Sequence, residues 1–279
     1  MMKAWMTPWL LVALPLLGAG LSLLLRPSLQ RMKTSALLTT IASLLAVVGT
    51  PWALGDTMAG VPFLCLVPLT AFLSLLGQPL HHDNTPAWTM TLVLLGLGLG
   101  ILSAPAPAHD IMLLILLALL CSLLYRFQSG TSAETWRGLS SYGLGLVSTV
   151  LALMLPTPAA TVALLITCGT LLPLLPIHSG FVATLTGLPG NLPAFLTLLL
   201  PTVGFHTLLL LLPNLTVTIL HTVAILALAG AVYASLRALI QSRPLSRLAY
   251  AAVAFFGMLW WYIADTGTAP IQATVYLSA

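Results

Sequence analysis

Charged residues are scarce in this sequence. Asp, Glu, Lys and Arg together make up 5% of the 279 residues, whereas soluble domains contain about 25%. Hydrophobic residues make up 59%, and the mean hydropathy is +1.08. This composition excludes a soluble globular domain and predicts a polytopic membrane protein. The net charge of +4 comes from basic residues in short loops, so it indicates orientation in a membrane rather than a nucleic-acid partner.

Paired cysteines and catalytic motifs are also absent. The cysteines stand alone within apolar runs, which excludes a disulfide framework and predicts small buried hydrophobes. They are Cys65, Cys121 and Cys168. The sequence has no Gly-rich phosphate loop and no Ser/His/Asp, redox-cysteine or flavin signature. His81, His82 and Asp83 are metal-ligand types, but adjacent side chains rarely point the same way, so a solvated loop or a subunit contact is favoured. We therefore expect no catalytic residue, metal or cofactor on this chain itself.

Long apolar runs separated by proline and glycine dominate the chain. Runs of roughly 17 to 25 residues can each cross a bilayer as a helix. The candidate spans lie near residues 9–25, 35–54, 61–77, 87–104, 111–125, 138–155, 159–175, 192–212, 215–236 and 248–264, and an apolar stub at 270–279 begins another. The prediction is an all-α membrane protein with about ten or eleven transmembrane helices. Residues 1–279 form a single transmembrane domain in this interpretation, and GLGLG at 96–100 lets helices approach closely.

The few charges alternate between loops. Eight of the nine basic residues fall in the odd-numbered loops or beside them, as the positive-inside rule predicts for one face of the membrane. Glu134, Arg137, Arg243 and Arg247 are expected at helix ends, where they anchor the spans. Glu134 and Arg137 lie one turn apart, so an i,i+3 ion pair is geometrically available to them.

Residues 176–195 interrupt the pattern of regular spans. The segment contains three prolines, which cannot all be accommodated in one straight helix. They are Pro176, Pro189 and Pro193. Irregular backbone at membrane depth is tolerated where it is buried in protein or lines a wet cavity, and in transporters it marks the ion path. The segment therefore predicts a broken helix, and a loop between two spans is the alternative.

Three histidines are the candidates for proton transfer. His178 lies in the predicted break, and His206 and His221 lie in or near the following spans. Imidazole exchanges protons near neutral pH, and an ionisable group within a span is by default a functional hypothesis. A neutral histidine hydrogen-bonded to a backbone carbonyl is the alternative for each.

The segment LPIHSGFVATLTGLPGNLPAFLTLLLPTVGFHTLLLLLP resembles the broken-helix region of the antiporter-like membrane subunits of respiratory complex I and their cation/proton antiporter relatives. That family shows Pro-Phe-His, then a Gly-x-Pro segment, then a helix ending near Gly-Phe. RPLSRLAYAAVAFFGM is similar to the family's Leu-Lys-Arg-Leu-Leu-Ala-Tyr-Ser-Ser run. The resemblance is strongest over residues 88–275 and favours subunit 2, the N subunit in bacteria, over the related subunit 4.

The sequence departs from this family at the residues to which proton transfer is attributed. The family has a Glu in the fifth helix and Lys residues in the following helices. The aligned positions here are Leu119, Leu171 and Pro201, and Ser246 replaces the Lys of Leu-Lys-Arg. The resemblance therefore implies a divergent and shortened member whose Lys/Glu proton route is degenerate.

The resemblance implies a membrane-arm subunit of a proton-translocating NADH:ubiquinone oxidoreductase. Such a subunit does no redox chemistry itself and supports proton translocation or the assembly of the membrane arm. NADH, flavin, iron–sulfur clusters and quinone are then expected on partner subunits, and the partners are other membrane-arm subunits and lipids. The mitochondrial inner membrane is favoured over the bacterial plasma membrane. The alternative is a subunit of a cation/proton antiporter or another stand-alone secondary transporter, which we expect to keep a charged residue at mid-membrane.

Overall fold

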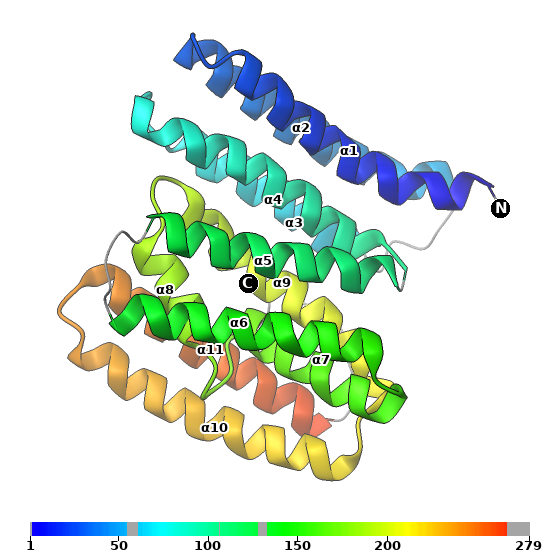
Figure 1. Ribbon diagram of the computed structural model, residues 1–279, viewed down its shortest axis with the longest axis vertical. Coiled ribbons are helices and arrows are strands. Elements are labelled where there is room, and N and C mark those ends of the chain that lie inside the picture. The colour runs from blue at the N-terminus through cyan, green and yellow to red at the C-terminus, as the bar shows by residue number, and fades with distance from the viewer. Residues whose placement is uncertain (1, 55–60, 106, 128–132, 267–279) are drawn as a thin grey trace. The chain divides into compact units, whose positions relative to one another are not determined.

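The computed structural model describes residues 2–54, 61–105, 107–127 and 133–266. These residues form eleven α-helices and no strand (Figure 1). The helices are α1 (Met2–Leu24), α2 (Leu29–Leu54), α3 (Val61–Leu76), α4 (Thr85–Ser103), α5 (Ala108–Phe127), α6 (Ala133–Met154), α7 (Thr157–Leu171), α8 (Ser179–Gly187), α9 (Leu192–Leu211), α10 (Val217–Ile240) and α11 (Pro244–Thr266). Two short 3-10 helices, η2 (His82–Asn84) and η3 (Leu212–Asn214), precede α4 and follow α9.

Within the described part of the chain, six helical segments are long and apolar enough to cross a membrane. They are Leu29–Gly49, His82–Ser103, Ala108–Phe127, Leu192–Asn214, Val217–Ile240 and Pro244–Thr266. Three shorter apolar helices are Trp9–Leu24, Leu64–Leu76 and Thr157–Leu171. The prediction of an all-α polytopic membrane protein is therefore confirmed. The expected ten or eleven spans exceed the six segments that meet the criteria of length and hydropathy, and the expected stub at 270–279 lies outside the described residues.

The described residues group into two compact units. Of the described residues, those up to Leu116 and Pro189–Leu199 form the first unit, and those of 117–188 and from Leu200 onward form the second. In the first unit α1 packs against α2 and α4, and α3 packs against α2 and α4. In the second unit α6 packs against α7 and α8, while α11 packs against α10 and α8. The single transmembrane domain expected from the sequence stays a prediction.

Glycines on α4 allow close helix packing in the first unit. A Cβ atom built on Gly96 would lie 3.2 Å from the Val12 carbonyl oxygen of α1, and one on Gly100 would lie 2.7 Å from the Val12 side chain. A Cβ atom on Gly98 would lie 2.4 Å from the Leu199 side chain. No larger residue fits these positions without displacing a neighbour. The close approach predicted for GLGLG is therefore confirmed, and it is a packing feature.

A polar anchor holds the segment between α8 and α9 in the first unit. Gly190 adopts a φ of 66°, in the left-handed region that favours glycine. The next residue, Asn191, is 2% exposed, and its Nδ2 donates to Thr91 Oγ1 at 2.8 Å and to Ser74 Oγ at 3.2 Å. The start of α9 is thereby tied to α3 and α4. Buried amide groups need such partners in a membrane, where water cannot replace them.

Candidate functional site

The backbone between α7 and α8 is interrupted as the prolines predicted, although the boundaries differ. Residues 172–178 and 188–191 are non-helical, and the nine-residue helix α8 lies between them. The predicted break at 176–195 therefore consists of two short interruptions. Pro176 lies in the first interruption and Pro189 in the second. Pro193 is in the first turn of α9, where proline is tolerated because its missing N–H has no helical partner.

Uncharged donors hold the first interruption in the second unit. The indole Nε1 of Trp260, on α11, donates to the Leu172 carbonyl at 2.9 Å. The hydroxyl of Ser141, on α6, donates to the Ile177 carbonyl at 2.5 Å. Gly204 of α9 packs on the same segment, since a Cβ atom there would lie 2.6 Å from the Leu172 nitrogen. The two hydrogen bonds satisfy carbonyl groups of the non-helical segment, which have no partner within a helix.

His178 is the titratable side chain that the break presents to its neighbours. It lies at the N-terminal end of α8, and its ring centroid is 6.1 Å from those of both Tyr233 on α10 and Tyr250 on α11. The Pro176 carbonyl interacts with the imidazole, yet Nδ1 is buried without a hydrogen-bond partner. The Arg237 guanidinium lies 5.9 Å from the Tyr250 ring centroid. An imidazole, two phenols and a guanidinium thus meet beside the break.

A row of hydroxyl groups lies buried along α6. The Tyr142 hydroxyl is 2.8 Å from Thr184 Oγ1 of α8, and Thr149 Oγ1 is 3.0 Å from Thr167 Oγ1 of α7. The buried residues of α6 are all small or polar and recur every three or four positions. They are Thr135, Gly138, Ser141, Tyr142, Gly145, Ser148 and Thr149. The sequence-based selection of site residues missed this row, and the helical spacing of Ser, Thr and Gly within SAETWRGLSSYGLGLVSTV was the available signal.

The other two candidate histidines lie on different helices from His178. His206 is half-buried on α9, and His221 is exposed near the start of α10. Hydroxyl groups such as those on α6 can relay protons only together with a group that titrates. The proposed proton-transfer roles of His178, His206 and His221 stay predictions.

The predicted helix-end charges lie near the first turns of two helices, α6 and α11. Glu134 and Arg137 are exposed in the first turns of α6, and within the described residues no ion pair joins them. Glu134 instead interacts electrostatically with Arg237 of α10. The i,i+3 ion pair between Glu134 and Arg137 is not formed. An exposed pair of this kind would stabilise the helix by only a few tenths of a kcal/mol.

The other two charges lie at the turn between α10 and α11. Arg243 immediately precedes α11 and is exposed. Arg247 donates from Nη2 to the Gln241 carbonyl at 3.0 Å, at the carboxyl end of α10. A cation is favourable there because it faces the negative end of the helix dipole.

Neutral side chains occupy the positions where the resemblance places the family's proton-carrying residues. Leu171 is fully buried at the end of α7, and Pro201 is buried within α9. Leu119 is half-buried on α5, and Ser246 is half-buried in the first turn of α11. None of these four residues can carry a charge.

Potential metal ligands do not cluster in the part of the chain that the structure describes: no group of three or more His, Cys, Asp or Glu residues could hold an ion there. His81 and Asp83 lie 3.3 Å apart at η2, and both side chains are exposed. His109 and Asp110 lie 2.8 Å apart at the start of α5. Each is a pair of neighbouring residues that makes a local contact.

Comparisons with known proteins place the fold among respiratory membrane complexes. No family model matches the sequence, and a search of curated proteins finds no similar chain. A chain of respiratory complex I from Thermus thermophilus with bound aureothin matches with a TM-score of 0.71 and 19% identity, over 96% of this chain and 67% of that one. A chain of the same complex with bound NADH matches with a TM-score of 0.70 and 19% identity, over 96% of this chain and 69% of that one.

A second type of complex shares the fold. A chain of the membrane-bound sulfane sulfur reductase, an archaeal respiratory membrane complex, matches with a TM-score of 0.80 and 14% identity. The match covers 96% of this chain and 53% of that chain, so this chain spans about half the length of that relative. At these identities the likeness establishes the fold, which is that of a membrane chain in respiratory complexes.

Proposed function

We propose that this chain is an antiporter-like membrane-arm subunit of a proton-translocating complex of the complex I type. The observation that carries the proposal is the fold, because 96% of the chain superposes on chains of respiratory complex I and of the sulfane sulfur reductase complex. The broken segment at 172–178 and the ordered motifs around it support the same assignment. The subunit 2 type, a mitochondrial inner membrane and ubiquinone as electron acceptor are the finer parts of the proposal.

The chain itself performs no redox step in this proposal. NADH, flavin, iron–sulfur clusters and quinone belong to partner subunits, and this chain contributes to proton translocation or to the assembly of the membrane arm. Its lysine/glutamate route is replaced by neutral residues at Leu119, Leu171 and Pro201. Proton transfer through the second unit would then use the candidate histidines His178, His206 and His221, of which His178 faces Tyr233 and Tyr250.

Native purification tests the placement in a complex. We expect the chain, extracted in a mild detergent, to migrate with several other membrane subunits and with NADH:quinone reductase activity. A chain that migrates alone and exchanges cations for protons when reconstituted in vesicles would instead be the stand-alone antiporter of the alternative interpretation. Migration alone without exchange would refute both.

A pair of histidine variants distinguishes proton transfer from assembly as the role of this chain within the complex. If His178 transfers protons, His178→Gln lowers the number of protons pumped per NADH oxidised, while the amount of assembled complex stays unchanged. His82→Gln is the matched control because His82 is exposed at η2 and is not a proton-transfer candidate. A normal pumping ratio in His178→Gln would leave assembly of the membrane arm as the function of this chain.

A further inference from the structure

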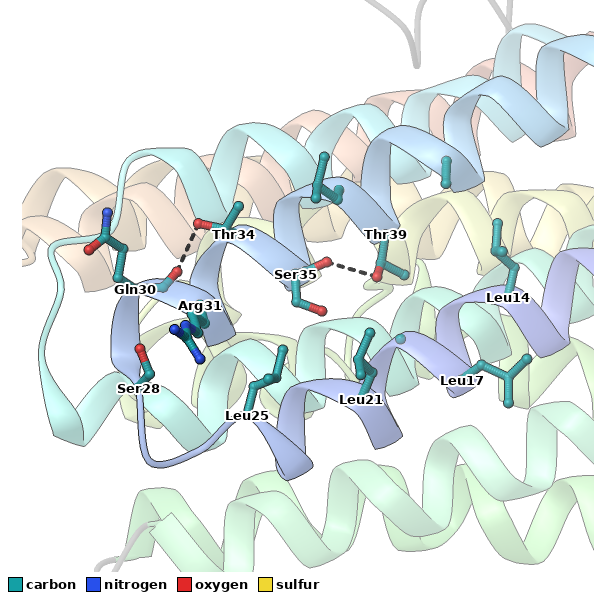
Figure 2. A pocket seen from close by; sticks show the side chains of 13 residues that line it. Leu14, Leu17, Leu21, Leu25, Ser28, Gln30, Arg31, Thr34, Ser35 and Thr39 are labelled. Carbon is teal, nitrogen blue, oxygen red and sulfur yellow. Dashed lines mark hydrogen bonds between the residues drawn. The ribbon is translucent and has the colours of Figure 1, made fainter.

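A groove runs between α1 and α2 in the first unit. Its volume is about 1010 Å³, comparable with the roughly 300–1,000 Å³ of small-molecule sites. One part is apolar and is formed by Leu17 and Leu21 of α1 together with Leu38 of α2. The other part lies at the α1–α2 turn and carries Ser28 and Arg31 (Figure 2). The groove therefore has an apolar trough and a basic, polar end.

A buried hydroxyl in the wall of this groove has no partner. Ser35 is 9% exposed, and its Oγ is buried without a hydrogen bond. Figure 2 shows the Ser35 side chain directed from α2 toward the side on which Leu21 of α1 and Leu25, just after α1, lie. Most serine and threonine hydroxyls nearby donate to their own helix, as Thr39 does to the Ser35 carbonyl at 2.8 Å. An unsatisfied buried hydroxyl is unfavourable, so this one indicates a polar atom of a ligand.

The charge of the groove selects the kind of ligand. Among the described residues that line it, Arg31 is the charged one and none is acidic. Its apolar part is open to the surface, since Leu17 is 73% exposed and Leu38 is 61% exposed. A transmembrane helix of a partner is apolar along its length and would leave the polar end unmatched. A ligand with one anionic end and a long apolar remainder fits both parts, and basic pockets between membrane helices are suited to anionic lipid headgroups.

We propose that this groove is a binding site for an anionic glycerophospholipid. Arg31 and Ser28 hold the headgroup phosphate, Ser35 donates to an ester oxygen of the glycerol backbone, and an acyl chain lies along Leu17 and Leu21. The site does not depend on the proposed respiratory function, since it requires only that the helices lie in a membrane.

Lipid titration of the purified full-length chain tests the site. We expect native mass spectrometry of the delipidated chain to show one tightly bound dioleoylphosphatidylglycerol and much weaker binding of dioleoylphosphatidylcholine. Arg31→Gln should weaken phosphatidylglycerol binding about fivefold, the effect of one basic residue near an anionic surface. Arg26→Gln is the matched control: Arg26 lies on the same turn and carries the same charge, but it does not line the groove. Equal weakening in both variants, or equal binding of the two lipids, would overturn the proposal.

Ser35→Ala distinguishes a lipid contact of the Ser35 hydroxyl from a purely structural role, because the two measurements change independently. The delipidated variant should unfold at the same or a higher temperature, because an unsatisfied buried hydroxyl has been removed, while phosphatidylglycerol binding weakens. Unchanged lipid binding in Ser35→Ala would contradict the proposed contact. Inorganic phosphate at millimolar concentration should not displace the lipid, and displacement would show a free-anion site. A photo-crosslinker at Leu21 in native membranes should label lipid, whereas labelling of a protein would show that a partner helix occupies the groove.

Discussion

Replacing Trp260 with phenylalanine should loosen the break between α7 and α8. Trp260 is 1% exposed, and its indole N–H is the donor to the Leu172 carbonyl. Phenylalanine keeps an aromatic ring there but leaves this buried carbonyl without a partner, which costs about 1–3 kcal/mol. The phenyl ring is smaller than the indole and leaves a void, and the loss of a few buried carbons destabilises the segment by about 1 kcal/mol more. The local opening free energy of the break should therefore fall by about 2–4 kcal/mol.

Hydrogen–deuterium exchange measured in detergent micelles reads out this local change. A loss of about 2–4 kcal/mol speeds exchange of the amides at the end of α7 by roughly thirtyfold to several hundredfold. The amides of Leu172 and Leu174, which donate to the Cys168 and Gly169 carbonyls, should show the effect. Trp136→Phe is the control because Trp136 is 61% exposed on α6. Equal exchange rates at residues 168–178 in the two variants would refute the tethering role of the indole.

Three further substitutions test other contacts. Gly204→Ala places a Cβ atom against the break and should lower the thermal unfolding temperature. Gly143→Ala on α6 is the control: no atom lies within 4 Å of a Cβ built there, so the unfolding temperature should stay unchanged or rise slightly. Similar effects of the two changes would contradict the close approach of Gly204 to the break. Tyr142→Phe removes the buried hydroxyl contact between α6 and α8 and should cost about 1 kcal/mol in denaturant unfolding, while Tyr125→Phe, at an exposed position, should cost nothing measurable. Lys33→Met removes the ammonium group that donates to two carbonyls at the carboxyl end of α3. We expect faster amide exchange confined to that end of the helix. Unchanged exchange there would show that the ammonium does not stabilise the helix end.

Hydropathy and composition predict the membrane class and the helical fold well because the bilayer leaves so few alternatives. An apolar run of sufficient length must form a helix, since no water is present to satisfy its backbone. The boundaries of the break were less predictable. Pro176 and Pro189 mark interruptions correctly, but nothing local indicates that residues 179–187 between them return to a helix. That outcome depends on packing against α6, where Tyr142 bonds to Thr184.

For the candidate site, too, the sequence indicates single residues but not which distant residues pack against them. His178 was selected because an ionisable residue is conspicuous in an apolar sequence. The sequence holds no comparable signal for Tyr233 and Tyr250, which approach the imidazole from α10 and α11. Nor does it indicate that Trp260 reaches a carbonyl 88 residues away. Such pairings arise from helix arrangement, which hydrophobic periodicity does not specify in a lipid-exposed bundle.

The two donors that hold the break are an indole and a serine hydroxyl, Trp260 and Ser141. Neither group titrates near physiological pH, and dissolved salt does not screen their hydrogen bonds as it screens an ion pair. These two tethers therefore respond neither to ionic strength nor to a pH difference across the membrane. A break held by a lysine would respond to both quantities. In this chain the two tethers hold the break without the use of a charged side chain.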